Sequence, residues 1–433
     1  MSTGEQAGTP ADNRGGLLAG RKLWIPEMGR GSSIAFAAAF RSVGIDAEIC
    51  PESDQRTMEL GGRHTSGEEC LPAKITLGNF LKVTEQPGFA PERTAFFMTT
   101  ADGPCRFGQY APYITGVLKD LKLDQVTVFS PSSRDGYGGI GVHARELMRT
   151  ALRGLVCADV LRAMVHRTRP YEATRGDADR VHDGAIDAVS RVLERPGLAH
   201  KVRMQQLEAA LVEARGQFRR IAANKSGDRP LIGVLGEIYC RLTPFANNTL
   251  IRKIEDLGGE CVLAPLVEWV RYTNEEHQKR LRRKGLRFSK AMLGARISDY
   301  IQGRDEHRLY HVFAEELKGY EEPSIREVLE ASMPYLPHTG ALGEMTLSVG
   351  KAVCYYRQGC DGVVDVSPFT CMNGIVTEAV YPRVSADHDD IPIRNAYFDG
   401  ARANLDRDLD VFMELARSYR GRKAARRGPG ARR

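Results

Sequence analysis

Two stretches of this chain repeat one local pattern: an apolar strand, a polar turn, a helical run, a glycine and a second strand. The first stretch covers residues 22–50 and the second covers 231–264. Short apolar runs that alternate with helical runs indicate parallel strands connected by crossover helices. The sequence therefore predicts an α/β protein built from two parallel-sheet units.

Composition divides the 433 residues further. Glycine becomes rare between the two units, and charged residues recur there at helical spacing, which predicts a helical connector. We expect the flanking units to be Rossmann-like or flavodoxin-like, with the ligand site between them. The predicted segments are a flexible leader (1–20), a first α/β domain (21–143), the connector (144–228), a second α/β domain (229–419) with a helical insertion (272–330), and a disordered basic tail (420–433).

The basic tail contributes much of the formal net charge of +6. It holds seven Lys or Arg residues and no acidic residue. A nucleic-acid role is conceivable for such a tail, but no nucleic-acid motif accompanies it, so a solubilising end is the preferred interpretation. No apolar stretch approaches the ~18–20 residues of a membrane span. We expect a cytoplasmic protein with no membrane partner and no nucleic-acid partner.

Three of the nine cysteines lie in turn-like segments instead of inside apolar runs: Cys70, Cys105 and Cys371. Cys105 follows the strand predicted at 94–98 and Cys371 follows the one at 362–366, so both are expected at the ligand-binding edges of their sheets. Cys70 leads into a helix, whose N-terminal amides favour a thiolate. Three converging thiolates could hold an iron–sulfur cluster with one open iron. Their spacing alone matches no local cluster signature and slightly favours three unrelated thiols.

The other cysteines have more apolar surroundings. Cys50 and Cys261 end matching strands in the two units, and Cys157 lies among apolar residues of a helix, so all three are expected in the core. Cys240 lies just beyond a strand end and could be a fourth ligand or line the site. Cys360 precedes a tight turn and is a weaker candidate ligand.

The residues around these cysteines carry a further signal. The stretches concerned are 67–74 (GEECLPAK), 103–110 (GPCRFGQY), 236–239 (GEIY) with 244–247 (PFAN), and 368–372 (PFTCM). Together they resemble the 2-hydroxyacyl-CoA dehydratase superfamily. The dehydratase-like part of the acyl-CoA dehydratase activase-related proteins is the most similar.

This resemblance implies a [4Fe-4S] cluster on Cys70, Cys105 and Cys371, with a double-cubane cluster as the variant found in related proteins. It implies a lyase that dehydrates a hydroxyacyl-CoA by reductive radical chemistry, or a cluster-dependent reductase component acting on a small molecule. Electrons would come from an ATP-dependent activase. The sequence contains no GxxxxGK[ST] motif, so the ATPase would be a separate partner protein. We also expect a homo- or hetero-oligomer.

Charged residues next to the motifs are candidates for catalysis. Glu68, Glu69 and Glu237 could act as acids or bases, although helix capping or solvation explains them equally well. Arg106 could attract an anionic ligand or pair with Glu69. The glycine turn at 29–33 could hold a phosphate or simply make a tight turn.

Two other functions stay open at this level. The chain could be a non-catalytic module of the same fold that binds a ligand or partner, with its cysteines free of metal. It could also be a regulatory or assembly protein that acts through the basic tail.

Overall fold

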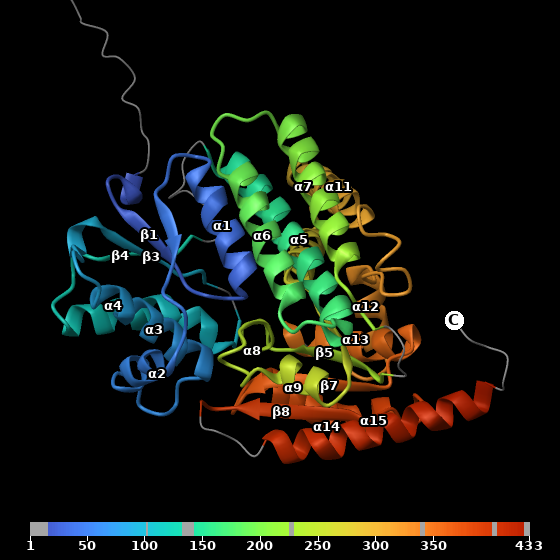
Figure 1. Ribbon diagram of the computed structural model, residues 1–433. Coiled ribbons are helices and arrows are strands. Elements are labelled where there is room, and N and C mark those ends of the chain that lie inside the picture. The colour runs from blue at the N-terminus through green and yellow to red at the C-terminus, as the bar shows by residue number, and fades with distance from the viewer. Residues whose placement is uncertain are drawn as a thin grey trace, which may run out of the picture.

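The computed structural model describes residues 16–100, 103–131, 143–224, 229–337, 343–400 and 405–427. It confirms an α/β architecture with two separate four-stranded sheets, and all strand pairs within them are parallel. Figure 1 shows the first sheet on one side of the molecule and the second below a group of long helices. The prediction of two parallel-sheet units is therefore correct.

The first unit has the strand order β2-β1-β3-β4. Helix α1 connects β1 to β2, and helices α2 and α3 lie between β2 and β3. Its elements are β1 (Lys22–Ile25), α1 (Arg30–Arg41), β2 (Ala47–Ile49), α2 (Gln55–Gly62), α3 (Leu71–Thr84), β3 (Thr94–Phe97), η3 (Arg106–Gln109), α4 (Tyr110–Asp120) and β4 (Thr127–Phe129).

The second unit repeats this arrangement with the order β6-β5-β7-β8. In both units the chain reverses direction across the sheet after its second strand, so the strand order switches between β1 and β3 and between β5 and β7. Ligands of open parallel sheets commonly bind at the carboxyl ends of the strands at such a switch. The elements of the second unit are β5 (Leu231–Gly236), α8 (Ile238–Leu242), α9 (Leu250–Asp256), β6 (Glu260–Leu263), α13 (Glu344–Gln358), β7 (Gly362–Pro368), α14 (Met372–Ala386), β8 (Ile393–Phe398) and α15 (Leu405–Arg427).

The central strands β5 and β7 are buried along their whole lengths. Helices cover both faces of a parallel sheet, which explains their continuous apolar sequences. The exception is Asp365 in β7, which accepts hydrogen bonds from the hydroxyls of Tyr381 (2.6 Å), Thr377 (2.9 Å) and Ser367 (3.2 Å). Burial raises the pKa of Asp365, and these three donors partly offset that effect.

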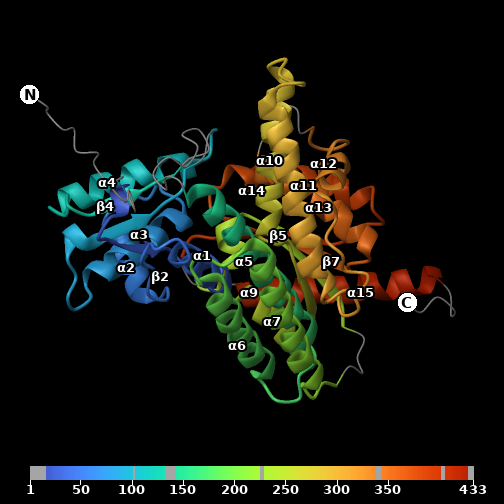
Figure 2. The same cartoon turned by 90° about the horizontal axis from the view of Figure 1, so that it is seen from above.

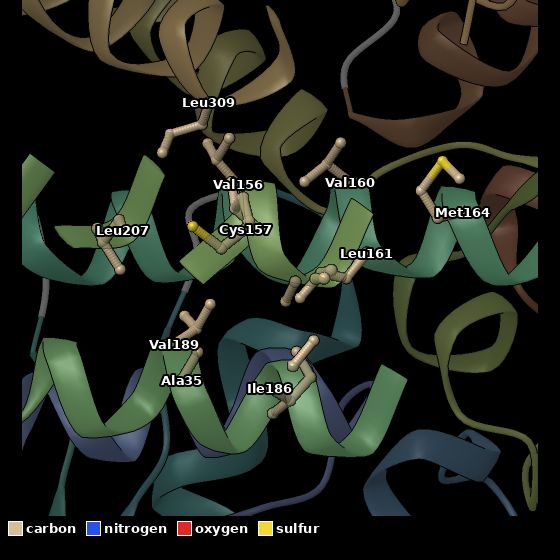
Figure 3. Packing of buried hydrophobic residues seen from close by; sticks show 14 of the residues in the cluster. Ala35, Val156, Cys157, Val160, Leu161, Met164, Ile186, Val189, Leu207 and Leu309 are labelled. Atoms are coloured by element: carbon tan, nitrogen blue, oxygen red, sulfur yellow. The ribbon is translucent and has the colours of Figure 1, made fainter. Parts of the chain in front are cut away.

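The predicted connector and insertion form one helical body. Helix α5 packs against α1 and α6, while α11 packs against α5 and α7. Figure 3 shows side chains of α5, including Val156 and Leu161, between Ile186 of α6 and Leu309 of α11. The helices of this body are α5 (Ala144–Thr168), α6 (Asp177–Leu193), α7 (His200–Arg220), α10 (Val267–Arg283) and α11 (Lys290–His311). Helix α12 (Ile325–Ser332), at the end of the predicted insertion, packs instead against α13 in the core of the second unit.

A buried charge pair joins the two helical segments. Arg153 of α5 donates to Asp305 of α11 at 2.8 Å, and both side chains are almost fully removed from water. Arg149 donates to the same carboxylate at 2.9 Å. No helix within the described ranges is both long enough and apolar enough to cross a bilayer.

The C-terminal prediction was wrong over residues 420–427. Helix α15 continues to Arg427 instead of ending near Tyr419. Arg420 and Lys423 pair with the buried Asp361, and Arg426 pairs with Asp389 at 2.9 Å. Acidic partners from other segments thus neutralise these three cations of the predicted tail. Residues 428–433 lie outside the described part of the chain.

The predicted leader also ends earlier than expected. Gly16–Leu18 forms a 3-10 turn, and the Leu18 side chain is buried in the core of the first unit. Residues 1–15 of the leader lie outside the described residues.

Candidate functional site

The three motif cysteines occupy the same local position in three different helices. Cys70 is the N-cap residue of α3, Cys105 that of η3 and Cys371 that of α14. All three have extended backbone geometry, with φ/ψ of −69/157°, −66/133° and −69/125°. At an N-cap the free amides of the first turn lie near the side chain, and these amides act to lower the pKa of the thiol.

One guanidinium connects the loops that carry these cysteines. Arg106, directly after Cys105, donates to the carbonyl of Glu68 and to the carbonyl (2.9 Å) and hydroxyl (3.1 Å) of Thr370. Glu68 lies two residues before Cys70, and Thr370 directly precedes Cys371. Arg106 therefore joins its own loop to one 38 positions before it and to one 264 positions after it.

The backbone at Thr370 is in the left-handed region, with φ of 63°. A β-branched residue rarely adopts this conformation, because its side chain crowds the backbone. Arg106 holds both the carbonyl and the hydroxyl of this residue. The loop before Cys371 is therefore kept in an unfavourable conformation by a contact from the first unit.

The thiols of the three cysteines differ in exposure but share a pKa direction. Cys70 is buried, Cys371 is half-buried and Cys105 is exposed. Removal from water raises the pKa of each, to about 12 for Cys371, where the Glu237 carboxylate adds to the effect. Thiols with raised pKa values are poor nucleophiles at neutral pH, so the site does not suit cysteine-based covalent catalysis.

Tyr110 supplies a polar partner to one of these sulfurs. Its hydroxyl oxygen lies 2.5 Å from the sulfur of Cys70, and its ring is buried in the first unit. Burial raises the pKa of Tyr110 well above its usual value, so the hydroxyl keeps its proton and can donate it to a thiolate.

Two carboxyl groups lie beside the cysteines. Glu237 is the N-cap of α8 and accepts from the amides of Tyr239 (3.0 Å) and Cys240 (2.8 Å). Glu344, at the start of α13, accepts from the amide of Ile238 (2.7 Å) and the side-chain amide of Asn373 (3.0 Å). The predicted capping role of Glu237 is thus correct.

The two carboxyl groups also affect the pKa of the thiols electrostatically. Both Glu237 and Glu344 raise the pKa of Cys105 and of Cys371. Burial, followed by the charge of Glu237, raises the pKa of Glu344 itself to about 8. A proton is therefore held at Glu344 in neutral solution.

The other two predicted acids differ from this pair. The carboxylate of Glu69 accepts from the amides of Ser66 (2.8 Å) and Gly67 (3.2 Å). Burial opposes ionisation of Glu69, but these hydrogen bonds outweigh it and hold the pKa below its usual value. Glu68 is exposed, and its backbone carbonyl binds Arg106. The alternative pairing of Arg106 with Glu69 is therefore wrong.

Cys240 and Cys360 have different surroundings. Cys240 is fully buried, and burial raises the pKa of its thiol, with further contributions from Glu237, Cys70 and Cys371. Cys360 precedes the amino end of β7, whereas Cys371 follows its carboxyl end. The length of that strand separates Cys360 from the site by about 20 Å. Cys50, Cys157 and Cys261 are core residues, as predicted.

The glycine turn at 29–33 is covered by protein. A Cβ on Gly31 would lie 3.0 Å from the side chain of Ile186, and one on Gly29 would lie 3.3 Å from Arg162. The hydroxyl of Ser33 accepts from the amide of Met28 at 2.9 Å. The tight-turn interpretation therefore holds, and the turn offers no open phosphate site.

A cavity of about 730 Å³ lies elsewhere, at the amino ends of the strands in the first sheet. Arg21, Lys22 and Asp46 line it. It is thus on the opposite edge of that sheet from Cys105.

Three residues of the site were not predicted: Tyr110, Glu344 and Asn373. Tyr110 closes the 103–110 motif and Asn373 lies two residues after Cys371, so both could have been found from the cysteine motifs. Glu344 has no local signal beyond its place before an apolar helix. Only the packing of α13 against α14 brings it to the site.

The donor set does not suit a single metal ion. Within the ranges that the structure describes, no three His, Cys, Asp or Glu side chains form a group that could hold one ion. A cluster of four irons requires a wider arrangement of ligands than a single ion does. Each thiolate binds its own iron, so the sulfur ligands lie farther apart.

These features define a two-unit α/β protein with three cysteines at helix N-cap positions, where loops of the two units meet. No protein-family model matches the chain, and no curated protein matches it either. The functional conclusion must therefore rest on the residues of the site.

Proposed function

We propose that this chain is an iron–sulfur protein of the 2-hydroxyacyl-CoA dehydratase type. Cys70, Cys105 and Cys371 would hold a [4Fe-4S] cluster between two Rossmann-like or flavodoxin-like units. The observation that carries the proposal is the contact of Arg106 with the loops of Cys70 and Cys371. It links the three segments that carry these cysteines through a single side chain.

The residues present fit such a group. Three thiols at helix N-termini supply three thiolates once a cluster displaces their protons, and a set of three leaves one iron without a protein ligand. When bound, the cluster supplies low-potential electron transfer and a Lewis-acid position for a substrate oxygen.

The chain's own residues then have defined tasks. Tyr110 donates a hydrogen bond to the sulfur of Cys70 and stabilises its negative charge. Glu344 holds a proton beside the site, and Asn373 orients its carboxyl group. Glu237 is anchored by two amides, so its oxygens stay in place next to Cys371.

An apolar rim borders Cys371. Phe369, Met372 and Ile375 are exposed around it. A substrate acyl chain or a docked partner that covered this rim would exclude water from the site. The proposed substrate is an acyl-CoA or another small molecule, and electrons would come from an ATP-dependent activase. We keep the proposals of a cytoplasmic location and of a homo- or hetero-oligomer.

The second candidate is a ligand- or partner-binding module without metal. The raised pKa values of the thiols favour it, because they keep the metal-free cysteines neutral and unreactive. In that case the exposed rim would itself be the binding surface.

Anaerobic iron and sulfide quantification separates the two. We expect brown wild-type protein with about four irons per chain, or about eight for a double-cubane cluster, and loss of most of the iron in Cys70→Ala, Cys105→Ala and Cys371→Ala. Cys157→Ala, a buried thiol of the helical body, is the control and should keep its iron. Cys240→Ala tests a fourth ligand. Unchanged iron in all three site variants would refute the assignment, and a colourless reconstituted wild type would support the module.

A further inference from the structure

The hairpin of α10 and α11 is the most distinctive surface outside the cysteine site. Figure 2 shows it rising beyond the rest of the molecule, with the turn between the two helices at its far end. The sequence from residue 277 to 298 contains eight Lys or Arg residues and no Asp or Glu. The positive charge of the hairpin end alone therefore exceeds the net charge of +6 of the whole chain.

Most of these cations are available to a partner. Lys279 and Arg282 pair with Glu276 (2.9 Å) and Glu275 (3.3 Å) on the same helix. The cations nearer the end are all exposed and form no ion pair within the described ranges; they are Arg283, Lys284, Arg287, Lys290 and Arg296. A surface that concentrates unpaired cations in this way is complementary to an anionic partner.

Large apolar side chains are exposed at the same end. Phe288, in the turn, is 95% exposed and Leu286 lies two residues before it. Leu293, Ile297 and Tyr300 follow on α11 at the spacing of one helix face, and all are exposed. The body of the hairpin is well packed by comparison, since Leu281 and Met292 are buried between its helices.

We propose that the α10–α11 hairpin end binds the surface of an anionic phospholipid bilayer. The cations would lie at the headgroups, and Leu286 and Phe288 would enter the interface. Basic residues flanking exposed apolar ones are the composition of segments that bind at membrane surfaces without crossing them.

The distribution of these residues along the hairpin favours a bilayer surface over other anionic partners. The first acidic residue on α11 is Asp299, which lies nine positions, or about 14 Å, along the axis from the start of the helix. The five unpaired cations all precede Asp299, so they are confined to the end of the hairpin. Segments of this kind sink into the interfacial layer by about 5–10 Å, which is enough to take in Leu286 and Phe288 in the turn. A nucleic-acid backbone would leave Leu286, Leu293 and Ile297 in water.

The inference is independent of the proposed cluster. It is compatible with a cytoplasmic protein, because the hairpin would bind a surface and not span the membrane. It departs from our expectation of no membrane partner, which considered only spanning segments. The root of α10 adjoins the cysteine site, since the hydroxyl of Tyr272 accepts from the amide of Gly343 at 2.8 Å, next to Glu344.

Vesicle co-sedimentation of the full chain tests the inference. Vesicles of phosphatidylcholine alone are compared with vesicles containing about one third phosphatidylglycerol. We expect at least tenfold stronger binding to the anionic vesicles, weakened by added salt, since each basic residue near such a surface contributes about fivefold. Lys284→Glu with Arg287→Glu should reduce binding to the level of neutral vesicles, and Phe288→Ser should weaken it at least fivefold.

Matched controls come from α15. Leu415→Ser and Arg407→Glu alter an exposed apolar residue and an exposed cation elsewhere, and they should bind vesicles like the wild type. Far-ultraviolet circular dichroism checks that each variant is folded. Equal binding to both vesicle types, or full binding by the hairpin variants, would overturn the proposal. Hairpin-dependent binding to a DNA duplex without vesicle binding would overturn it in favour of a nucleic-acid partner.

Discussion

The cysteine site and the helical body use the same residue type in opposite ways. Cys157, in the middle of α5, is fully buried among aliphatic side chains and serves as a small apolar residue. Cys105 lies at a helix start on an exposed loop whose neighbour, Arg106, bonds to two other loops. Backbone position, and not residue type, therefore decides whether a cysteine packs in the core or is available to bind a ligand.

The two regions also differ in where their stability originates. The helical body combines a continuous apolar interior with the buried contact between Arg153 and Asp305. The site combines a left-handed threonine, buried carboxyls and thiols with raised pKa values. Changes in the body should therefore alter stability without altering the site. Changes in the site should affect iron binding and, through Glu344, the pH dependence of stability. The following tests run from the largest expected free-energy effect to the smallest.

Asp305→Ala should destabilise the protein most. It leaves Arg153 buried without its counterion, which costs about 3–5 kcal/mol. Urea unfolding followed by circular dichroism measures the loss. The exposed pair of Arg394 and Asp408 is the control, and Arg394→Ala should cost less than about 1 kcal/mol. Iron content per folded chain should be unchanged in both variants; a loss confined to Asp305→Ala would show that body and site are coupled.

Glu344 should make the stability of the site pH-dependent. Its pKa is raised to about 8 in the folded chain, so the folded state holds a proton that the unfolded chain releases above about pH 4.5. The stability contribution is complete below that pH and is lost as the pH rises through about 8. Allowing for coupling with Glu237, we expect the metal-free chain to lose about 2 kcal/mol between pH 6 and pH 8.5.

Glu344→Gln should remove this pH dependence, because an amide does not titrate. Urea midpoints at the two pH values measure it. Glu378→Gln, on the exposed side of α14, is the control and should leave the slope intact. An equal slope in the wild type and in Glu344→Gln would contradict the protonation assigned to this residue.

Tyr110→Phe should lower the reduction potential of the bound cluster. Without the hydroxyl, the negative charge on the sulfur of Cys70 loses its donor and the oxidised form is favoured. We expect about a tenfold change in the ratio of oxidised to reduced protein, or about 59 mV, in a spectroscopic redox titration.

Tyr113→Phe is the matched control for this measurement. Tyr113 is on the same helix, but its hydroxyl donates to the carbonyl of His64. It should leave the potential unchanged, and equal shifts in both variants would argue against a specific role for Tyr110.

Arg106→Ala should have the smallest effect on stability and a clear effect on the site. The side chain is only half-buried, so its removal should cost less than about 1 kcal/mol. The three loops lose their common contact, and we expect iron content to fall by at least half. Arg106→Lys should not restore it, since one ammonium cannot reach both Glu68 and Thr370 in the same geometry. Full iron loading in Arg106→Ala would show that the loops converge without this contact.

Much of the fold could be predicted because local patterns carry it. Helix α6 lies within the predicted helical connector (144–228), where acidic residues in its first turn and a clear apolar stripe are local signals of a helix. The buried strands could be found from their apolar runs. The end of α15 could not be predicted in this way. Its cations form ion pairs with Asp361 and Asp389, which come from other parts of the chain.

The candidate site likewise has some features that local sequence predicts and others that depend on distant parts of the chain. The sequence alone determined that Cys105 and Cys371 follow parallel strands and that Cys70 starts a helix, since strand and helix periods are local properties. Only the tertiary structure decided that Arg106 bonds to the other two cysteine loops and that Glu344 lies beside Glu237. Those contacts join segments up to 264 positions apart, and the packing of the two units against the helical body brings them into reach.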